Sequence, residues 1–523
     1  MRIVYLLVSI FLFGVLVPAQ SIVGPKGAIN FDKVNVCAKG QSSPQPCNRV
    51  SKINYNITAS TTFGTTEVVT QGVANLDFTL SATSCTGTLA AGSSCSVTAR
   101  FTPRTAGVRM GAVQLNDSSG NLLLSTYIYG SGQAPVAAFN PGAQRTLPVT
   151  GFDGSALAAD AAGNVYFSAG TTVAKFDIRS GAQTTVATGF NYVGGLAIDG
   201  AGNLFVSENN VVKVAAGTSV QTPVGTNLNS VIGVAVDGRG NIYAGDDWDN
   251  GQGLQEYPRL AEVFAATGGE QTLLGGYYYG LQGLPLLDYP VGVAVDGSGN
   301  AYVACVNYGP LYESVAGTSP EKEYGIIASR QFTAVGNFTN PYSVATDAAG
   351  DVYATDGVND VPAIYQVAAN GGYESVVVYG PWDSPIAVDG SGNVFFGNGD
   401  YQAPVLAEAK GSVAATLFFG KTAIGSTSAP QSITIQNVGT QPLNAVAPGL
   451  IVSTNFVQVT GPGTPADCSS TFALAPGALC NLSIVFAPQM LGTVRGMATF
   501  TDNALNKIPS ASQSVTLDGT GIQ

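Results

Sequence analysis

A short sequence with an Asp-Gly-x-Gly-Asn core, in which Ala replaces the first Gly in two copies and Asp the Asn in one, recurs six times in the middle of the chain and limits the folds open to it. Its anchoring aspartates are Asp160, Asp199, Asp237, Asp296, Asp347 and Asp389. They are separated by 39, 38, 59, 51 and 42 residues. A period of about 40 residues with about four short strands in each unit is typical of a β-propeller. The repeats therefore predict a propeller of six blades.

Each copy has the pattern of a β-hairpin. An apolar strand precedes the Asp, residues tolerant of positive φ form the turn, and a strand containing an aromatic residue returns. We expect the Asp carboxylate to accept hydrogen bonds from the amides of its own turn. The alternative, an EF-hand-like calcium loop, needs oxygen ligands at alternate positions and a late Glu, but Gly, Ala, Ser or Arg occupies those places. The pattern favours a turn.

The sixth copy lacks an outer strand, because the pattern of the next domain begins soon after "APVLAEA". The segment "QRTLPVTG", residues 144–151, precedes the first hairpin and has no hairpin of its own. We predict that this segment completes the last blade and so removes an open sheet edge.

The repeats resemble the NHL repeat over about residues 143–412. This resemblance implies a six-bladed propeller. The Arg of the family's Asn-x-Arg element is absent here, so the resemblance does not extend to a ligand surface. The repeats also resemble those of streptogramin-lyase-type propellers, whose chemistry depends on a catalytic His; with no His in the chain, that chemistry does not carry over.

Two segments flank the repeats and have the alternation of β-sandwich strands. From Thr416 the chain reads "TLFFGKTAIGSTSAPQSITIQNVGTQPL", with turn signals at intervals of about ten residues. The N-terminal segment shows the same landmarks in the same order. Both resemble the Ig-like domains of the choice-of-anchor D and ASPM/SPD-2/Hydin group of exported bacterial proteins. We therefore predict an all-β chain, with Ig-like sandwiches at residues 20–134 and 413–523 around a propeller at residues 135–412.

The first residues have the pattern of a signal peptide. Arg2 precedes an apolar run from Ile3 to Val17, and Val17-Pro18-Ala19 forms a cleavage site before Gln20. We predict a signal peptide at residues 1–19 and no transmembrane segment after its removal; an uncleaved anchor is the alternative. The expected location is outside the cell, in the periplasm or at the cell surface.

Seven cysteines fit an oxidising compartment. Six of them fall in close pairs, which predict the disulfides Cys37–Cys47, Cys85–Cys95 and Cys468–Cys480. The four N-terminal cysteines formally permit three connectivities. Cys305 is left over, and we expect a buried inert thiol rather than a nucleophile. The first pair encloses an insertion, which is either a structural loop or a recognition loop.

Charge and composition exclude several functions. The chain has 21 Lys and Arg against 33 Asp and Glu, a net charge of −12, and no basic run. Nucleic acid is therefore not an expected partner. The absence of His excludes Ser-His-Asp and Cys-His catalysis and His-ligated zinc.

One equivalent position in each repeat, nine residues after the anchoring Asp, is a candidate site. These positions hold Ala169, Glu208, Asp246, Cys305, Asp356 and Asn398, with Asp247, Asp249 and Asp400 nearby. Glu208, Asp246, Asp356 and Asn398 are candidate ligands for a divalent cation, which implies Ca²⁺ as a possible cofactor. Such a site would resemble that of the calcium-dependent gluconolactonase-type propellers. The alternative is that these side chains cap turns or lie solvated at the rim.

Two stretches between the third and fourth hairpins, residues 246–260 and 275–290, carry aromatic side chains. The candidate ligand-binding residues are Trp248, Tyr257, Tyr277, Tyr278 and Tyr279. Aromatic rings stack on sugars and anchor protein interfaces, so we expect a protein or carbohydrate partner; packing against the rim is the alternative. The sequence thus favours an exported, non-catalytic binding or scaffold protein without a cofactor. A divalent-cation-dependent hydrolase or lactonase is the rival interpretation.

Overall fold

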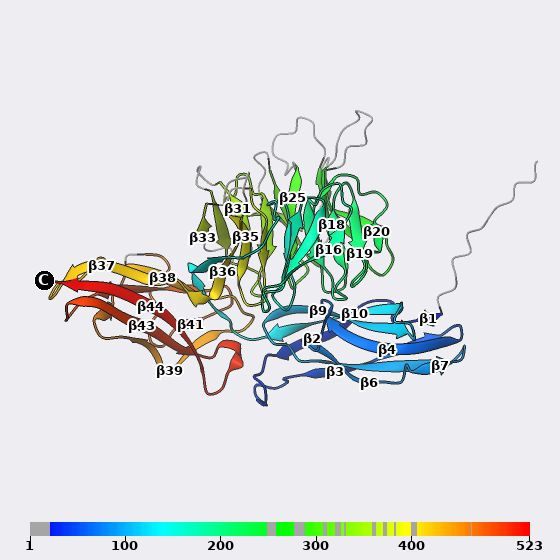
Figure 1. Cartoon of the computed structure of the whole chain (residues 1–523), viewed down its shortest axis with the longest axis horizontal. Helices are drawn as coiled ribbons and strands as arrows, with labels where there is room; N and C mark the ends of the chain where they lie inside the picture. Colours follow the sequence, from blue (N-terminus) through cyan, green and yellow to red (C-terminus); the bar gives the residue numbers. More distant parts are fainter. Residues whose placement is uncertain are drawn as a thin grey trace, which may run out of the picture.

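The computed structural model describes residues 21–247, 258–276, 287, 289–306, 311–318, 326–328, 331–357, 362–369, 374–380, 383–398, 405–461 and 463–523. Within these residues the chain is built from strands, with one short 3₁₀ helix at Ala504–Asn506. A six-bladed propeller lies beside two Ig-like sandwiches, as Figure 1 shows, so the predicted fold class is confirmed. None of the described helices has the length and apolarity needed to cross a membrane.

Six antiparallel sheets form the blades. The first two consist of β13 (Leu157–Ala159), β14 (Val165–Ala169), β15 (Thr172–Phe176) and β16 (Gln183–Thr188), then β17 (Gly195–Ile198), β18 (Leu204–Ser207), β19 (Val211–Val214) and β20 (Gln221–Val224). The next two consist of β21 (Val231–Val236), β22 (Ile242–Asp246), β23 (Arg259–Val263), β24 (Glu270–Gly276) and β28 (Ile326–Ala328), then β25 (Pro290–Val295), β26 (Ala301–Cys305), β27 (Leu311–Val315) and β29 (Gln331–Val335). The last two consist of β30 (Ser343–Thr346), β31 (Val352–Asp356), β32 (Ala363–Val367) and β33 (Glu374–Tyr379), then β34 (Ile386–Val388), β35 (Val394–Asn398), β36 (Val405–Ala414) and β12 (Gly142–Thr146).

The ring closes as predicted. The innermost strands contact one another in sequence order around the channel, and β34 contacts β13 to complete the circle. The last blade takes its outer strand from the start of the propeller, since β12 pairs with β36 in the register Gln144↔Ala409. The prediction that this segment completes the sixth blade is confirmed. Closure leaves no blade with a missing outer strand.

The recurring Asp is a turn residue in all six blades, as predicted. In the first blade, Asp160 Oδ1 accepts hydrogen bonds from the backbone N–H groups of Ala162 and Asn164, both at 2.9 Å. Its Oδ2 accepts a bond from the Asn164 side-chain amide at 2.8 Å. The other five aspartates accept equivalent bonds from the amides two and four residues later. These carboxylates therefore hold the hairpins in shape.

The N-terminal sandwich has two sheets. One contains β1 (Ile22–Val23), β3 (Arg49–Ile57), β8 (Ser94–Phe101) and β6 (Phe78–Thr83). The other contains β2 (Ile29–Asn35), β10 (Leu122–Gln133), β9 (Gly107–Asp117), β4 (Thr61–Thr70), β5 (Val73–Ala74) and β7 (Gly87–Leu89). Phe31, Phe78 and Phe101 are fully buried between the sheets, with Phe78 stacked on Phe101 at a centroid distance of 4.6 Å.

The C-terminal sandwich also has two sheets. One contains β11 (Ala137–Asn140), β38 (Gln431–Asn437), β42 (Leu479–Phe486) and β40 (Phe456–Gln458). The other contains β37 (Leu417–Ala423), β44 (Ala511–Ile522), β43 (Gly492–Asp502), β39 (Leu443–Val452) and β41 (Ala473–Leu474). The disulfides Cys37–Cys47, Cys85–Cys95 and Cys468–Cys480 form as predicted, the last one inside this sandwich.

The C-terminal sandwich borrows strand β11 from the segment that precedes the propeller. Residues 137–140, which the sequence placed within the propeller range, pair antiparallel with β38 in the register Phe139↔Ile435. Phe139 is 5% exposed, lies in the core of this sandwich and contacts Phe500 at a centroid distance of 6.2 Å. The fold of the last hundred or so residues thus depends on a strand made before the propeller.

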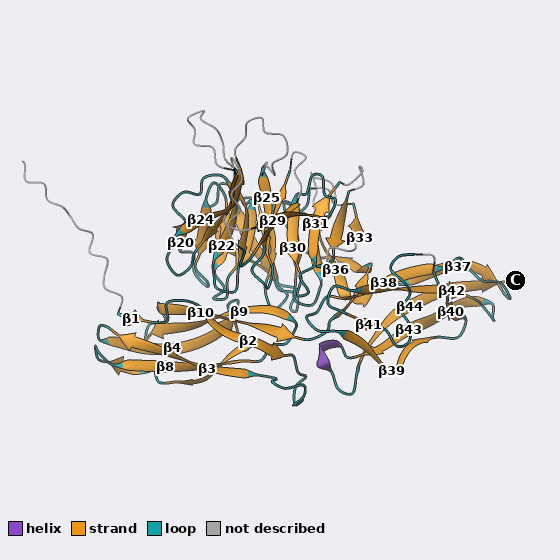
Figure 2. Ribbon diagram, turned by 180° about the vertical axis from the view of Figure 1, so that it is seen from behind, coloured by secondary structure: helices purple, strands orange, loops and turns teal. Residues whose placement is uncertain are grey.

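The N-terminal sandwich covers the turn end of the propeller, below the blades in Figures 1 and 2. Tyr127 on β10 donates a hydrogen bond to Asp199 Oδ2 at 2.7 Å, and Gln114 on β9 donates to the Ala201 carbonyl at 3.3 Å. Close approach is possible because Gly200 meets Gly111: a Cβ on Gly200 would lie 2.3 Å from the Gly111 carbonyl oxygen. Burial, followed by the charge of Asp199, raises the pKa of Tyr127 well above its usual range, so the phenol stays a donor.

The loop closed by Cys37–Cys47 joins the two sandwiches. Gln41 in this loop donates a hydrogen bond to the Asn506 carbonyl at 2.6 Å. The Asn506 amide donates in turn to the carbonyls of Val36 and Gln133, at 3.0 and 2.8 Å. The structural role of this insertion is therefore visible in its contacts with the C-terminal sandwich.

The fifth turn contacts the C-terminal sandwich through an Asp where the other five turns carry Asn. Asp351 Oδ2 accepts hydrogen bonds from Gln436 of β38 at 2.6 Å and from Gln366 at 3.2 Å. Asp347 and Asp351 are both buried, and Tyr353 donates to Asp347 at 3.1 Å. Burial raises the pKa of Asp351 to about 6, and burial together with Asp351 raises that of Asp347. Two carboxyl groups in one buried joint resist double ionisation.

We expect Phe139→Ala to lower the free energy of unfolding of the C-terminal sandwich by about 3 kcal/mol, because it removes a core side chain that the linker supplies. Urea unfolding with far-UV circular dichroism measures this. The matched control is Phe418→Ala, since Phe418 is 69% exposed in the same sandwich; its expected effect is within about 0.5 kcal/mol. Equal effects of the two substitutions would contradict a core role for β11.

We expect Asp351→Asn to reduce the pH dependence of stability, because Asp351 no longer titrates and its charge no longer adds to the raised pKa of Asp347. The folded-state pKa values of Asp347 and Asp351 are raised, so their protonated forms favour the folded state at low pH. This stability is lost as the pH rises from about 4 through about 6. At pH 7.5 the variant should be more stable than the parent by about 1–3 kcal/mol, and at pH 4 the difference should be smaller. Thermal melts across pH 4–8 test this; parallel curves would refute it.

Candidate functional site

The two ends of the propeller channel differ in what surrounds them. At the turn end, a cavity of 190 Å³ lies between the anchoring aspartates and strand β9 of the N-terminal sandwich. The channel itself narrows to a space of 60 Å³. Its walls are formed by small residues and backbone at the starts of the inner strands, among them Ser155, Gly195, Gly233 and Gly292. We call the opposite end, where the second strand of each blade finishes, the loop end.

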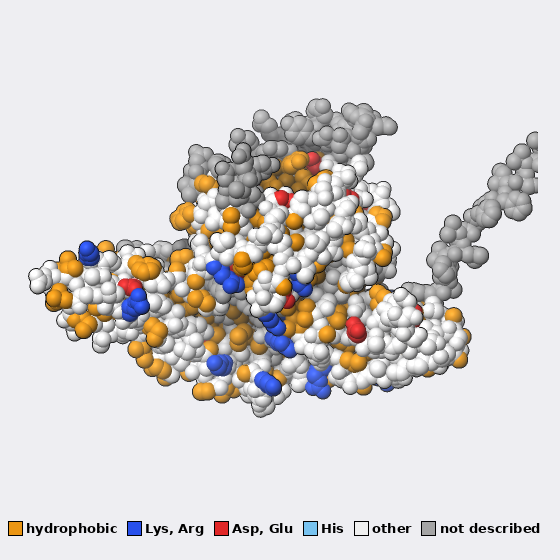
Figure 3. Space-filling model, in the orientation of Figure 1, with side chains coloured by type: hydrophobic (Ala, Val, Ile, Leu, Met, Phe, Trp, Pro, Cys, Tyr) orange, Lys and Arg blue, Asp and Glu red, His pale blue; other side chains and the backbone are white. Residues whose placement is uncertain are grey.

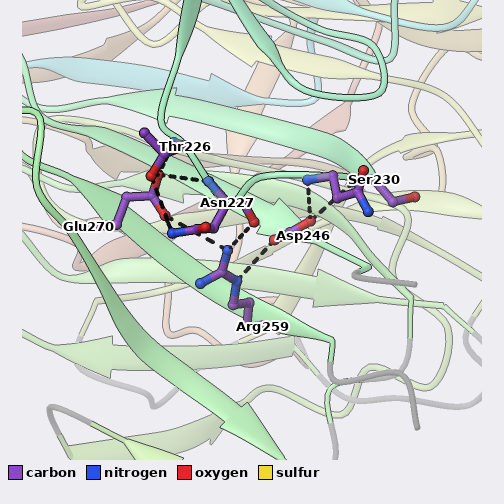
Figure 4. Close-up of polar contacts among 7 residues, drawn as sticks. Thr226, Asn227, Ser230, Asp246, Arg259 and Glu270 are labelled. Carbon is purple, nitrogen blue, oxygen red and sulfur yellow. Dashed lines mark hydrogen bonds and ion pairs between the residues drawn. The ribbon is translucent and has the colours of Figure 1, made fainter. Parts of the chain in front are cut away.

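One candidate residue at the loop end is Asp246, the last residue of β22. Its side chain is fully buried and is shown in Figure 4. Oδ1 accepts hydrogen bonds from the backbone N–H groups of Asn229 and Ser230, at 3.2 and 3.1 Å. Oδ2 pairs with the Arg259 guanidinium at 2.9 Å. Both oxygens are therefore engaged in holding the segment that enters the third blade.

Arg259 is a residue that the sequence did not single out. It is the first residue of β23, opposite Asp246, and its Nη2 also donates to the Asn227 carbonyl at 2.7 Å. Glu270 lies beside it, as Figure 4 shows, and accepts bonds from the amides of Thr226 and Asn227. Burial opposes ionisation of Glu270, but these amides and the Arg259 charge lower its pKa. The only sequence signal was a lone Arg at the end of an insertion.

Glu208 and Asp356 play the same role in their own blades. Glu208 accepts a hydrogen bond from the backbone N–H of Asn191 at 3.0 Å. Asp356 accepts bonds from Thr339 and Asn340, at 2.8 and 3.1 Å. In each case the donors lie 16 or 17 residues earlier, in the segment that enters the blade. These side chains cap loops, which was the alternative to a metal site.

The structure does not bring the four candidate metal ligands together. Each lies at the end of the second strand of a different blade, and Asn398 is exposed. Across the described ranges no group of three or more Cys, Asp or Glu side chains is placed to hold a metal ion. The described residues thus offer three loop caps rather than a ligand set, and a bound Ca²⁺ stays a prediction.

Several candidate residues lie outside the described residues. They are the five aromatic residues Trp248, Tyr257, Tyr277, Tyr278 and Tyr279, together with Asp249 and Asp400. The insertion that contains Trp248 and Tyr257 joins β22 to β23 at the loop end. Cys305 is fully buried as a thiol at the end of β26, which agrees with the expectation of a buried side chain.

One family model matches part of the chain. The model ASH, described as abnormal spindle-like microcephaly-associated, ASPM-SPD-2-Hydin, matches residues 404–508. This range agrees with the resemblance proposed for the C-terminal sandwich. A search of curated proteins finds no sequence match.

Solved structures with a similar fold include propellers and a sandwich. Regucalcin, a calcium-binding protein from Agrobacterium tumefaciens, is 13% identical and covers 52% of this chain and 94% of its own, with a TM-score of 0.38. The PQQ-bound aldose sugar dehydrogenase of Streptomyces coelicolor is 13% identical and covers 52% of this chain and 99% of its own, with a TM-score of 0.35. The human CEP192 ASH/PapD-like domain is 19% identical and covers 21% of this chain and 81% of its own, with a TM-score of 0.16. The chain is similar to these proteins in fold alone.

Proposed function

We propose that this chain is an exported binding or scaffold protein that recognises a protein or glycan with the loop end of its propeller. One observation carries the proposal: the N-terminal sandwich covers the turn end, through Tyr127, Gln114 and their backbone partners. The loop end is the propeller end that these contacts leave for a partner. It is also where the insertion with Trp248 and Tyr257 joins β22 to β23. Loops on a rigid propeller are common recognition elements.

The carboxylates at the loop end support a non-catalytic role. Asp246 and Asp356 are fully buried, and their oxygens accept backbone hydrogen bonds that fix the entering segments. A group used in this way positions loops, because its lone pairs are already directed at its own chain. The rival function, a cation-dependent hydrolase or lactonase, would require Glu208, Asp246, Asp356 and Asn398 to turn towards a common ion.

Export is part of the same proposal. Three disulfides form in the two sandwiches, which suits an extracellular or periplasmic environment. The apolar run at residues 3–17, which lies outside the described residues, supplies the signal peptide in this interpretation. We also infer that the repeats are of the NHL type and that the sandwiches belong to the choice-of-anchor D group, with the sandwiches acting as spacers or docking modules.

We expect one double variant, with Trp248→Ala and Tyr257→Ala together, to bind its partner about tenfold or more weakly than the parent protein does, because buried aromatic anchors dominate interfaces. A glycan array followed by biolayer interferometry on the strongest glycan, or on purified envelope proteins, measures this. The control Phe418→Ala removes an exposed aromatic residue from the C-terminal sandwich and should leave binding unchanged. Equal binding by all three proteins would contradict recognition through this loop.

We expect no saturable change in melting temperature when Ca²⁺, Mg²⁺ or EDTA is added, because the candidate carboxylates already have partners. A ligand that binds only the folded state raises stability by mass action, so the melt detects a native cation site directly. A saturable Ca²⁺ shift that Asp356→Asn abolishes would favour the hydrolase instead. Esters and lactones would then be the substrates to screen.

A further inference from the structure

A cavity of 680 Å³ lies where the three domains meet. Its walls include Lys33 and Gln133 from the N-terminal sandwich, Tyr302 and Glu313 from the fourth blade, and Thr440 from the C-terminal sandwich. Cavities of about 300–1,000 Å³ accommodate small organic ligands. This cavity shares Gly107, Asp296 and Asp347 with the cavity at the turn end, but it shares no lining residue with the narrow channel space.

A comparison of the six blades singles out Glu313 in this cavity. In each blade one polar residue of the third strand lies opposite an aromatic residue of the second strand. These pairs are Lys175 with Tyr166, Lys213 with Phe205, Glu262 with Tyr243, Glu313 with Tyr302, Gln366 with Tyr353, and Glu408 with Phe395. The six positions are equivalent, so we can compare the partners that each blade supplies to the polar side chain at this position.

The carboxylates at the equivalent position in other blades are satisfied by their own chain. Glu262 is 2% exposed and accepts hydrogen bonds from Tyr243 at 3.1 Å, Asn241 at 3.1 Å and Gln271 at 2.8 Å. Glu408 is also 2% exposed and pairs with Arg145 of β12. A buried carboxylate needs such partners, since desolvation of its charge is costly.

Glu313 is only partly buried and has fewer partners. Within the described residues the structure records one hydrogen bond to its carboxylate, from the Tyr302 hydroxyl to Oε1 at 3.1 Å. The partner of Glu262 on the outer strand is Gln271, but the residue opposite Glu313 is the shorter Thr333. Burial raises the pKa of Glu313, the Tyr302 hydroxyl opposes this, and the charge of Asp296 adds to the rise. A positively charged donor in the cavity would stabilise this carboxylate.

The wall from the N-terminal sandwich carries the opposite charge. Lys33 on β2 lines the same cavity, and its side chain is exposed. Residues 21–134 contain eight Lys and Arg against four Asp and Glu, whereas residues 135–412 contain nine against twenty-six. Figure 3 shows Lys and Arg side chains of the visible face over both sandwiches and at their junction with the propeller. The cavity thus lies between an acidic and a basic domain.

We propose that this junction cavity binds a small zwitterionic ligand of the amino-acid or short-peptide type. The ammonium group of the ligand pairs with Glu313, and its carboxylate faces Lys33. Charge-assisted hydrogen bonds at both ends fix the orientation. The hydroxyls of Ser131 and Thr333, on the two facing walls, supply neutral polar contacts between the ends. This inference is independent of the function proposed for the loop end.

The test is isothermal titration calorimetry of the whole protein at pH 7.5 with triglycine as the probe. Two derivatives separate the charged ends: N-acetyl-triglycine lacks the ammonium group, and triglycine amide lacks the carboxylate. We expect saturable binding of triglycine, and binding weaker by about tenfold or more for each derivative, because each loses one charge-assisted bond. Absence of saturable heat with triglycine, or equal affinity for all three probes, would overturn the proposal.

Variants assign the two ends. Glu313→Gln should weaken triglycine binding by about tenfold or more but leave the binding of N-acetyl-triglycine unchanged, because that probe has no ammonium group. Lys33→Gln should likewise weaken triglycine binding by about tenfold or more but leave the binding of triglycine amide unchanged, because that probe has no carboxylate. Glu67→Gln, at an exposed position of the N-terminal sandwich, is the charge-matched control and should bind like the parent. Affinity should also fall as the pH is lowered through the raised pKa of Glu313. Unchanged affinity in Glu313→Gln would refute the assigned contact.

Discussion

The structure depends on one repeated interaction, in which the aspartate of each turn accepts hydrogen bonds from the amides of that turn. Asp199 is fully buried, yet its two oxygens accept bonds from Ala201, Asn203 and Tyr127. The Asn four residues later extends this bond network, since Asn203 Oδ1 accepts the N–H of Ala216 beyond the third strand. Within the described residues, four of the six turns accept such a bond and so tie three strands of their blade at one end. Small residues beside the carboxylate then allow another domain to approach the backbone of the turn closely.

Close packing at the turn end of the propeller explains why the three domains form one assembly rather than separate domains joined by linkers. The N-terminal sandwich approaches closely enough for Gly200 to meet Gly111, and a shared apolar cluster of Val36, Ala134, Val136, Ala138 and Val438 lies where the domains meet. Interfaces that combine buried apolar contacts with satisfied polar groups resist relative motion. The polar cavity lined by Lys33 and Glu313 lies in the same junction. Its shape is consequently set by the relative placement of all three domains.

The sequence predicted what depends on local patterns. The six turns, closure of the last blade through Gln144 and the three disulfides follow from periodicity and cysteine spacing, and all are present. The pairing of β11 with the C-terminal sandwich was missed, because nothing in "AAFN" shows that Phe139 belongs to the C-terminal core. Glu208, Asp246 and Asp356, which the sequence singled out by their spacing, accept hydrogen bonds from the segments that enter their blades. Their role depends on donors 16 or 17 residues earlier and on Arg259, which spacing alone does not reveal.

The pairing of β11 and β12 has a consequence for biogenesis. Residues 137–146 leave the ribosome early, but their partners, β36 and β38, lie at residues 405–437. Until those partners emerge, the propeller ring stays open and the sheet that contains β38 cannot form. The adjacent strands β11 and β12 are therefore unpaired during this time. Non-local pairing of this kind delays folding. The chain is thereby kept unfinished through most of its synthesis, a state compatible with export as an extended polypeptide.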